Sequence, residues 1–361
     1  MKKLLLYAFA AFAILSLGSC SDDDGYNYVP PTDKYTGGFY VLNEGSYGHT
    51  PASVNYYNPA SGQWSLNIFQ ANNPGETLGN TGTMAVCGTD KMYLVSKGAP
   101  SLVEVGLADF VKKSALPEEA LSAQAYGFAL IDDAHGVLTT SEGAYSVALD
   151  PIRLDRAFYE GRALWGDVAV KGGHVFLTTS ANDGYVVKVY KASTLEFVKD
   201  FSSVTTGFTE AGGMLWAANK DKLVKIDPVT LTAEEFALPE GISVYYNQWT
   251  YTPSGLHASK RGDALYFVEG TSSGYDVYKY AIAAGTASKL FSAPVVEGQK
   301  YSVYASGLNI DPATDDLYLF YTNDWGAHAT IYVVDGASGE LKKTFPYTDA
   351  EYWFPSMLIF R

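Results

Sequence analysis

An internal repeat constrains the fold of this chain more than any other feature. Six segments share one order: a short apolar strand, a polar turn, a second apolar strand ending in small or polar residues, a loop and a third strand. They begin 40 to 52 residues apart, at Met84, Phe128, Val168, Phe208, Leu256 and Leu308. Four short strands in each period of this length are typical of β-propeller blades.

A seventh unit is divided between the two ends of the chain. "SMLIF" at the C-terminus reads as an inner strand without followers, whereas "GFYVLNEG" and "VNYYNPASGQW" near the N-terminus read as followers without an inner strand. Pairing them closes the ring and removes the open sheet edges. We therefore predict an all-β, seven-bladed β-propeller over residues 38–361, closed by pairing the C-terminal strand with the N-terminal strands. Six or eight blades are the alternatives, and a pair of β-sandwiches would not explain the constant period.

The first 37 residues indicate export. Two lysines, an apolar run short for a bilayer span, and small residues ahead of Cys20 have the layout of a secretory signal peptide. The sequence predicts a lipoprotein signal peptide over 1–19, lipidation of Cys20, and a flexible Pro/Gly/Asp-rich tether over 20–37. The acidic "SDDD" after Cys20 resembles the signal that sends Bacteroidetes lipoproteins to the outer leaflet, so we expect lipid anchoring in the outer membrane at the cell surface. An uncleaved membrane helix is the alternative.

Charge and cysteine content narrow the possible partners. The formal net charge of −14 argues against nucleic acid or an acidic membrane surface. Cys87 is the one cysteine after Cys20, so the folded body has no internal disulfide, and Cys87 is expected to be a small buried hydrophobe.

The predicted topology places aromatic residues on one face of the ring. Loops that precede each inner strand, and loops between second and third strands, share one face, which we call the loop face. The remaining turns form the turn face, and their sequences are small, charged and almost free of aromatics. The loop-face residues expected to contact a ligand are Asn43, Glu44, Tyr47, His49, Tyr126, Trp165, Asn182, Asp183, Tyr246, Trp249, Tyr251, Tyr304, Trp325, His328 and Trp353.

This asymmetry favours binding of a bulky ligand at the loop face. Aromatic side chains give large contact area with little rotamer entropy to lose, and Tyr and Trp keep a polar group. A concave ring of them, interspersed with Asn, Asp and Glu, suits a partly planar, hydrogen-bonding molecule. The other interpretation is that single aromatics pack between blades, and Tyr245 in "YYNQWTY" fits that equally well.

The sequence holds no strong catalytic motif, so we expect a binding protein rather than an enzyme. The nucleophile elbow, the zinc-protease helix and the phosphate-binding loop are all missing from it. The best enzyme candidate is Glu44, because propeller lactonases place a metal-binding glutamate near an equivalent position. Asn219, Asn309 and Asp167 would then complete an oxygen-ligand set for Ca²⁺ or Mn²⁺.

Motifs near the start of the predicted propeller point to a family. "GFYVLNEGSYGHTPASVNYYNPASGQW" followed by "LGNTGTMAVCGTDKMYLV" resembles the YncE-like, DUF5074-type propellers of Bacteroidetes surface lipoproteins, although this chain reads "YYNP" where aspartate is commoner. That group includes the BtuG-type lipoproteins, which capture cobalamin and pass it to a TonB-dependent transporter. The resemblance implies capture of cobalamin or another corrinoid as transported ligand, with no further cofactor required. A glycan- or protein-binding scaffold and a metal-dependent, lactonase-like hydrolase are the alternatives.

Overall fold

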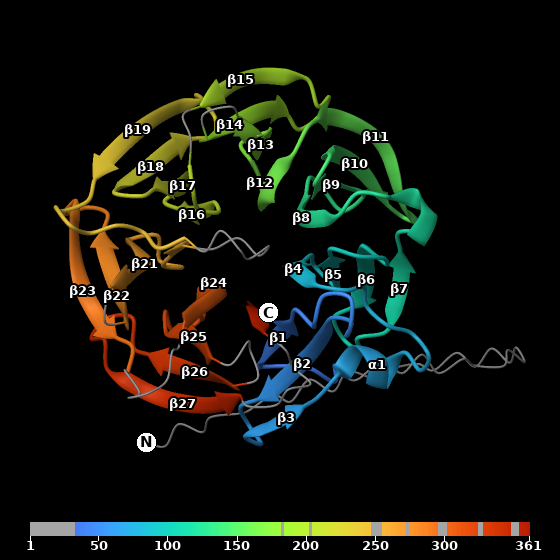
Figure 1. The fold of residues 1–361 in the computed structure, drawn as a ribbon, viewed down its shortest axis with the longest axis horizontal. Coiled ribbons are helices and arrows are strands. Elements are labelled where there is room, and N and C mark those ends of the chain that lie inside the picture. The colour runs from blue at the N-terminus through green and yellow to red at the C-terminus, as the bar shows by residue number, and fades with distance from the viewer. Residues whose placement is uncertain are drawn as a thin grey trace, which may run out of the picture. The chain divides into compact units, whose positions relative to one another are not determined.

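The computed structural model describes residues 33–181, 184–201, 204–246, 255–271, 274–294, 302–323, 328–347 and 354–361. Their strands form seven four-stranded antiparallel sheets, each built from strands that follow one another along the chain, except for the sheet that joins the two ends. Figure 1 shows these sheets arranged around a central axis. The prediction of an all-β, seven-bladed propeller is confirmed.

The blades are numbered in chain order from the first continuous one, and each is given from its inner to its outer strand. Blade 1 contains β4 (Gly82–Cys87), β5 (Lys91–Ser96), β6 (Leu102–Gly106) and β7 (Lys112–Ala115). Blade 2 contains β8 (Ala125–Leu130), β9 (His135–Thr140), β10 (Gly143–Leu149) and β11 (Ile152–Glu160). Blade 3 contains β12 (Ala163–Lys171), β13 (His174–Ala181), β14 (Gly184–Lys191) and β15 (Phe197–Phe201).

The remaining blades follow the same order. Blade 4 contains β16 (Thr209–Ala211), β17 (Met214–Asn219), β18 (Lys222–Asp227) and β19 (Thr232–Ala237). Blade 5 contains β20 (Leu256–Ala258), β21 (Ala264–Thr271), β22 (Gly274–Ala281) and β23 (Thr286–Ser292). Blade 6 contains β24 (Ser302–Ile310), β25 (Leu317–Asn323), β26 (His328–Val334) and β27 (Leu341–Tyr347). Blade 7 contains β28 (Pro355–Phe360), β1 (Phe39–Asn43), β2 (Ser53–Asn58) and β3 (Gln63–Ser65).

The hydrophobic core lies between the blades. Each of the seven buried clusters joins two neighbouring blades, so that together they complete the ring. In β5, Met92 and Leu94 pack toward blade 7, whereas Tyr93 and Val95 pack toward blade 2. Alternate residues of a strand point to opposite faces, and both faces of these strands are covered, which explains their near-continuous apolar sequences.

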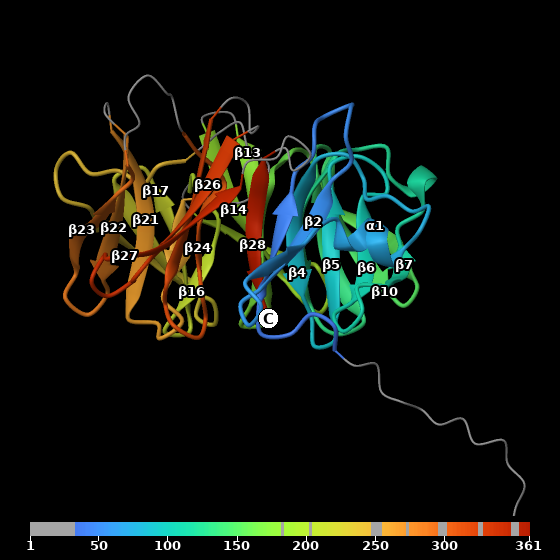
Figure 2. The same cartoon turned by 90° about the horizontal axis from the view of Figure 1, so that it is seen from below.

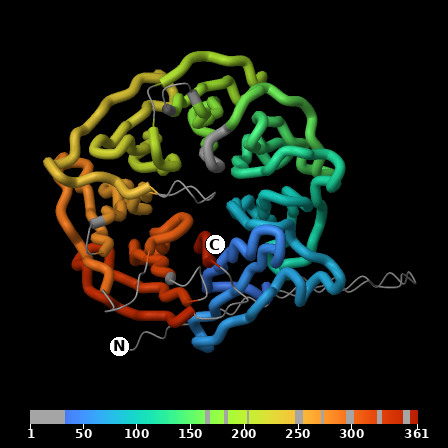
Figure 3. Tube along the Cα trace, in the orientation of Figure 1, coloured from blue at the N-terminus to red at the C-terminus, as the bar shows by residue number. Residues whose placement is uncertain are grey.

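The ring closes where the two ends of the chain meet. In blade 7, β28 pairs with β1, and Phe360 lies opposite Phe39. The red C-terminal strand therefore lies beside the blue N-terminal strands in Figures 1 and 3. Beyond this strand pair, Arg361 Nη1 lies 2.7 Å from Asp33 Oδ1. The predicted closure is confirmed.

The folded unit begins at Asp33, five residues ahead of the expected start at Gly38. Tyr35 is only 3% exposed, and its ring contacts those of Tyr40, Tyr56 and Phe110. Residues 33–37 were expected to be tether because their composition is polar, yet the buried Tyr35 ring, the Asp33–Arg361 ion pair and a hydrogen bond from the Lys34 N–H to Ala108 attach them to the propeller. The predicted signal peptide, Cys20 and the tether up to residue 32 lie outside the described residues.

Short helical segments occupy two of the connections. Helix α1 (Ile68–Asn72) lies between blades 7 and 1, and a 3-10 helix (Glu118–Ala120) lies between blades 1 and 2. Ile68 and Phe69 of α1 are buried in the cluster between blades 7 and 1. Within the described residues, no helix is long and apolar enough to span a membrane.

The inner strands are irregular at one end. Each runs from the loop face toward the turn face, and Figure 2 shows these strands from the side. Register shifts interrupt five inner-strand pairings near the loop face, at Gly82/Met84, Ala125/Gly127, Ala163/Val168, Val303/Leu308 and, on the partner of β28, Leu42/Asn43. Such bulges turn side chains away from their regular direction, and they recur at the rims of barrels and beside functional sites.

Candidate functional site

Glu44 is held in place by its own backbone at the loop-face end of the inner strands β28 and β4. It follows β1, and its N–H donates to the carbonyl of Phe354, with a nitrogen–oxygen distance of 2.9 Å. Its carbonyl accepts a hydrogen bond from the N–H of Gly82, at 2.8 Å. Glu44 thus ties the start of β28 to the start of β4, which fixes where its side chain begins.

The Glu44 carboxyl lies in an environment that favours its neutral form. Burial raises its pKa from an ordinary 4.5 to about 7, and this rise is opposed by a hydrogen bond with Tyr304 and by the charge of Lys97. A carboxyl with this pKa is present in both protonation states near neutral pH, so it can accept a hydrogen bond or donate one.

Tyr304 and Phe354 form a stacked pair beside Glu44. Their ring centroids are 4.5 Å apart and their planes are inclined by 29°. Phe354 has a φ of 60°, and Ala305, next to Tyr304, has a φ of 53°. This left-handed conformation is costly for residues other than glycine and tends to persist where the surrounding structure or a function requires it.

Lys97 and Tyr47 complete the group. The Lys97 ammonium lies 4.3 Å from the centroid of the Tyr47 ring, close enough for a cation–π interaction. Lys97 is 8% exposed, whereas Tyr47 is 65% exposed, so the ring covers the lysine and presents its other face outward. We call Glu44, Tyr47, Lys97, Tyr304 and Phe354 the loop-face cluster.

Two predicted ligand contacts lie inside the blades instead. Asn43 is fully buried, donates to Ser53 Oγ at 3.1 Å and accepts from the Tyr347 hydroxyl at 2.9 Å. Tyr126 is 2% exposed and lies 3.4 Å from Gln124 Oε1. Both adjoin register shifts, which set the direction of their side chains. These two residues were expected to contact a ligand, and the structure gives them buried positions with hydrogen-bond partners inside the protein.

The other described candidates lie in loop-face segments. His49 and His328 are exposed, and Tyr246 is half-buried. Tyr245 packs edge-on against Tyr275 next to the cluster between blades 5 and 6, which confirms the interpretation that it packs between blades. The side chain of Trp165 on β12 is not described, and the candidates outside the described residues are Asn182, Asp183, Trp249, Tyr251, Trp325 and Trp353.

Of the oxygen ligands proposed to join Glu44 around a metal, Asn309 lies elsewhere. Asn309 lines a pocket at the turn face, and its Oδ1 accepts the N–H of Leu358 at 3.2 Å. Asn219 ends β17, and the side chain of Asp167 is not described. Among the described residues, no group of three or more His, Cys, Asp or Glu side chains is placed to hold a metal ion.

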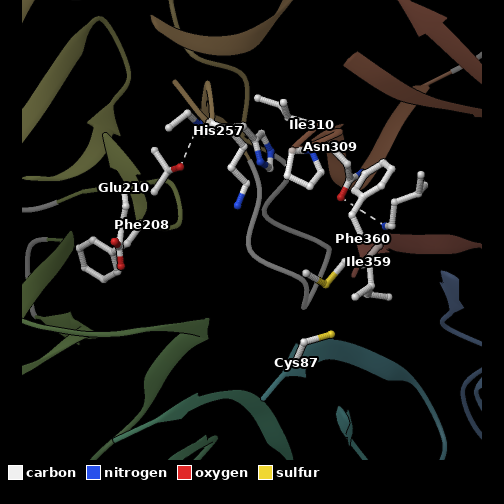
Figure 4. A pocket seen from close by; sticks show the side chains of 14 residues that line it. Cys87, Phe208, Glu210, His257, Asn309, Ile310, Ile359 and Phe360 are labelled. Carbon is white, nitrogen blue, oxygen red and sulfur yellow. Dashed lines mark hydrogen bonds between the residues drawn. The ribbon is translucent and has the colours of Figure 1, made fainter. Parts of the chain in front are cut away.

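A pocket of about 600 Å³, which we call the channel pocket, lies at the turn-face ends of inner strands from several blades (Figure 4). Cys87, Phe208, His257 and Asn309 are among its lining residues. His257 Nε2 lies 3.1 Å from the carbonyl oxygen of Ser306, and burial lowers its pKa to about 4. Burial also raises the pKa of the Cys87 thiol to about 11, which leaves it unreactive at neutral pH.

Sequence reasoning did not identify Lys97 or the channel pocket. Lys97 lies in the loop between the second and third strands of blade 1, so the same topological rule that identified Glu44 also reaches it. The channel pocket was not expected, because it is formed by the ends of inner strands from several blades, and only the closed ring brings them together.

Comparisons with known structures agree with the fold. A quinonprotein alcohol dehydrogenase-like protein from Bacteroides thetaiotaomicron is 18% identical, with a TM-score of 0.70 over 90% of this chain and 78% of that one. A putative 6-phosphogluconolactonase from Bacteroides fragilis is 13% identical, with a TM-score of 0.61 over 89% and 97%. A periplasmic gluconolactonase from Pseudomonas aeruginosa is 14% identical, with a TM-score of 0.58 over 90% and 99%.

Sequence comparison identifies the family. No curated protein matches the chain. Residues 37–361 match the family described as "Domain of unknown function (DUF5074)", which covers nearly all of the folded unit. The chain therefore belongs to the DUF5074 family.

Proposed function

We propose that this protein is a surface lipoprotein that captures cobalamin or another corrinoid at its loop face and passes it to a TonB-dependent outer-membrane transporter. The observation that carries the proposal is the loop-face cluster. There, a Tyr304–Phe354 stack and the exposed Tyr47 ring lie beside the half-buried Glu44 carboxyl, whose pKa is about 7.

The chemistry of the cluster matches that of a corrinoid. A corrinoid is a wide disc with amide side arms, and aromatic rings offer contact area to its faces. The Glu44 carboxyl can pair with either the N–H or the carbonyl of an amide, because both of its protonation states are present near neutral pH. The fixed backbone around Glu44 limits the entropy lost on binding.

The position of the chain start supports display of the loop face. Asp33 pairs with Arg361 just beyond the turn-face end of β28, and Lys34 N–H donates to Ala108 in the turn between β6 and β7. The folded unit therefore begins at the turn face, on the opposite side of the ring from the loop-face cluster.

Calorimetric titration of the mature protein with cyanocobalamin and cobinamide tests the proposal. We expect micromolar or tighter binding of at least one corrinoid, and weaker binding by Glu44→Gln. The matched control is Glu234→Gln, which removes one exposed carboxylate from β19 and should bind as the wild type does. A titration without heat, or an equal loss of corrinoid affinity in both variants, would refute the proposal. If the protein binds no corrinoid but does bind a glycan array, the scaffold alternative is favoured.

A hydrolase is a second candidate because of Glu44 itself. A carboxyl with a pKa of about 7 is suited to general acid–base catalysis at neutral pH. We would measure gluconolactone hydrolysis with added Ca²⁺ or Mn²⁺. Turnover by the wild type that Glu44→Gln abolishes would establish this activity, whereas equal rates in both proteins would rule it out.

A further inference from the structure

A divided cleft lies on the turn face between blades 1 and 2, away from the loop-face cluster. One cavity of about 300 Å³ is lined by residues of both blades, including Lys91, Glu104, Lys113 and Asp150. A second cavity of about 310 Å³ shares Asp90 and Lys91 with the first and extends to Asp133. We call the two together the blade 1–2 cleft.

Glu104, on β6, is a buried carboxylate at the wall of this cleft. Its side chain is 3% exposed, and its Oε1 lies 3.0 Å from Lys91 Nζ. Its Oε2 is buried without a hydrogen-bond partner among the described residues. Burial, the charge of Glu104 and a hydrogen bond with Glu104 raise the pKa of the Tyr93 hydroxyl to about 12, and Oε2 still has no hydrogen-bond partner among the described residues.

An unsatisfied carboxylate oxygen is costly unless something in the adjoining space pairs with it. Leaving a buried acceptor unpaired costs about 1–3 kcal/mol, and more when it is charged. Water can fill this role, but a water molecule occupies only about 30 Å³ of liquid volume. The cavity beside Glu104, at about 300 Å³, therefore has room for an organic group as well.

The charges around the cleft favour a cation. Lys91 is engaged by Glu104, and Lys113 Nζ lies 3.5 Å from Asp109. The remaining carboxylates of the cleft have no ion-pair partner in the part of the chain that the structure describes; they are Asp90, Asp133 and Asp150. The pKa of Lys91 is raised, first by its hydrogen bond with Glu104 and further by the charges of Glu104, Asp90 and Asp150. The cleft thus holds more negative charge than its own lysines neutralise.

We propose that the blade 1–2 cleft binds a small organic cation that carries a primary ammonium group, with Glu104 Oε2 accepting its hydrogen bond and Asp90 and Asp150 adding attraction. An ammonium fits better than a metal ion, because no group of three or more His, Cys, Asp or Glu in the described ranges is arranged for metal binding. It would be a second binding site, independent of the loop face.

The test is calorimetric titration of the mature protein with 1,5-diaminopentane at low ionic strength, with 1-pentanol as the neutral comparison. We expect millimolar or tighter binding of the diamine and no heat from the alcohol. Glu104→Gln should weaken binding at least ~10-fold, because hydrogen bonds to charged groups contribute about 1.5–3 kcal/mol. Glu234→Gln, with the same change in charge on exposed β19, should leave affinity unchanged.

Stability and competing ions complete the design. If thermal unfolding shows that Glu104→Gln does not fold, the exposed pair Asp90→Asn and Asp150→Asn replaces it, and we expect the double variant to bind the diamine ~3-fold or more weakly. Absence of heat with the diamine, equal affinities in Glu104→Gln and Glu234→Gln, or binding of Ca²⁺ in place of the diamine would each overturn the proposal.

Discussion

The two faces of the ring each hold a half-buried titratable side chain, and partial burial shifts the pKa of one upward and that of the other downward. At the loop face, the pKa of Glu44 rises to about 7. At the turn face, the pKa of His257 falls to about 4. In both cases burial favours the neutral form. His257 is thereby neutral throughout the physiological range, whereas Glu44 changes its charge within that range.

The backbone around these residues differs as well. Glu44 contacts Tyr304, which lies between the register-shift positions Val303 and Leu308, and Phe354 next to it has a φ of 60°. His257 lies in the regular pairing of β20 with β21 and bonds to a backbone carbonyl. Irregular backbone and a titrating group thus occur together at the loop face. This coincidence is the reason for proposing ligand binding there rather than in the channel pocket.

The largest expected effect concerns the stability contributed by Glu44. Below pH 4.5 the carboxyl is neutral in both the folded and the unfolded chain. As pH rises from 4.5 to about 7, the unfolded chain loses its proton first, so the free energy of unfolding falls by about 3 kcal/mol on this account. Urea unfolding of wild type and Glu44→Gln at pH 4.5 and pH 8 measures this. Between pH 4.5 and pH 8, we expect the free energy of unfolding of Glu44→Gln to rise by that amount relative to the wild type. The same pH dependence of stability in both proteins would contradict this prediction.

His257 should show the reverse dependence, of similar size. Above pH 6.5 the imidazole is neutral in both states, and its contribution to stability is complete. As pH falls from 6.5 toward 4, the unfolded chain binds a proton first, so the free energy of unfolding drops by about 3 kcal/mol. Unfolding of His257→Gln at pH 7 and pH 4 should lack this drop, while the exposed His49→Gln keeps it. If His257→Gln shows the same drop in the free energy of unfolding at low pH as the wild type, the drop does not come from His257.

Ligand affinity separates the two ends more directly. Replacing an aromatic residue at the centre of a binding site costs about 2 kcal/mol or more, which is about 30-fold in affinity. We expect Tyr304→Ala to lose at least this much affinity for cyanocobalamin. Phe208→Ala, which truncates an aromatic side chain in the channel pocket, should bind normally. Calorimetry on both variants, with thermal unfolding to compare their stability, checks this, and equal losses would remove the distinction between the ends.

The smallest expected effect concerns Lys97. Its charge lowers the pKa of Glu44, although less than Tyr304 does. Lys97→Met should therefore raise the pKa of Glu44 above 7, by less than about one unit. Carbon-detected NMR titration of the Glu44 carboxyl gives the midpoint directly. An unchanged or lower midpoint would mean that Lys97 does not act on this carboxyl.

Most of the fold could be predicted from the sequence because blades repeat. The period and the apolar strands reflect contacts that each blade makes with its neighbours, so the pattern recurs wherever the contacts do. The start of the body at Asp33 and the buried helix α1 could not be predicted in the same way. They depend on a few side chains, Tyr35 in the first case and Ile68 and Phe69 in the second, that pack between blades 7 and 1.

The placement of the candidate site residues on one face was predictable, but their individual environments were not. Topology placed Glu44, Tyr47 and Tyr304 on one face, and the structure brings them together with Lys97 and Phe354. It also placed Asn43 and Tyr126 there, and both are buried. Adjacent residues of a strand point in opposite directions, and a bulge changes which of them faces the channel. The shifts beside Asn43 and Tyr126 leave no mark in the sequence that would reveal them.

Hydrogen–deuterium exchange with and without cyanocobalamin tests the central claim most directly, because it reports both faces of the ring in one experiment. If the loop face binds the corrinoid, amides of residues 44–50 and 302–306 will exchange more slowly with ligand. Those of the turn-face segments 87–91 and 131–135 will be unchanged. Protection confined to the turn face, or no protection at either face, would contradict the account.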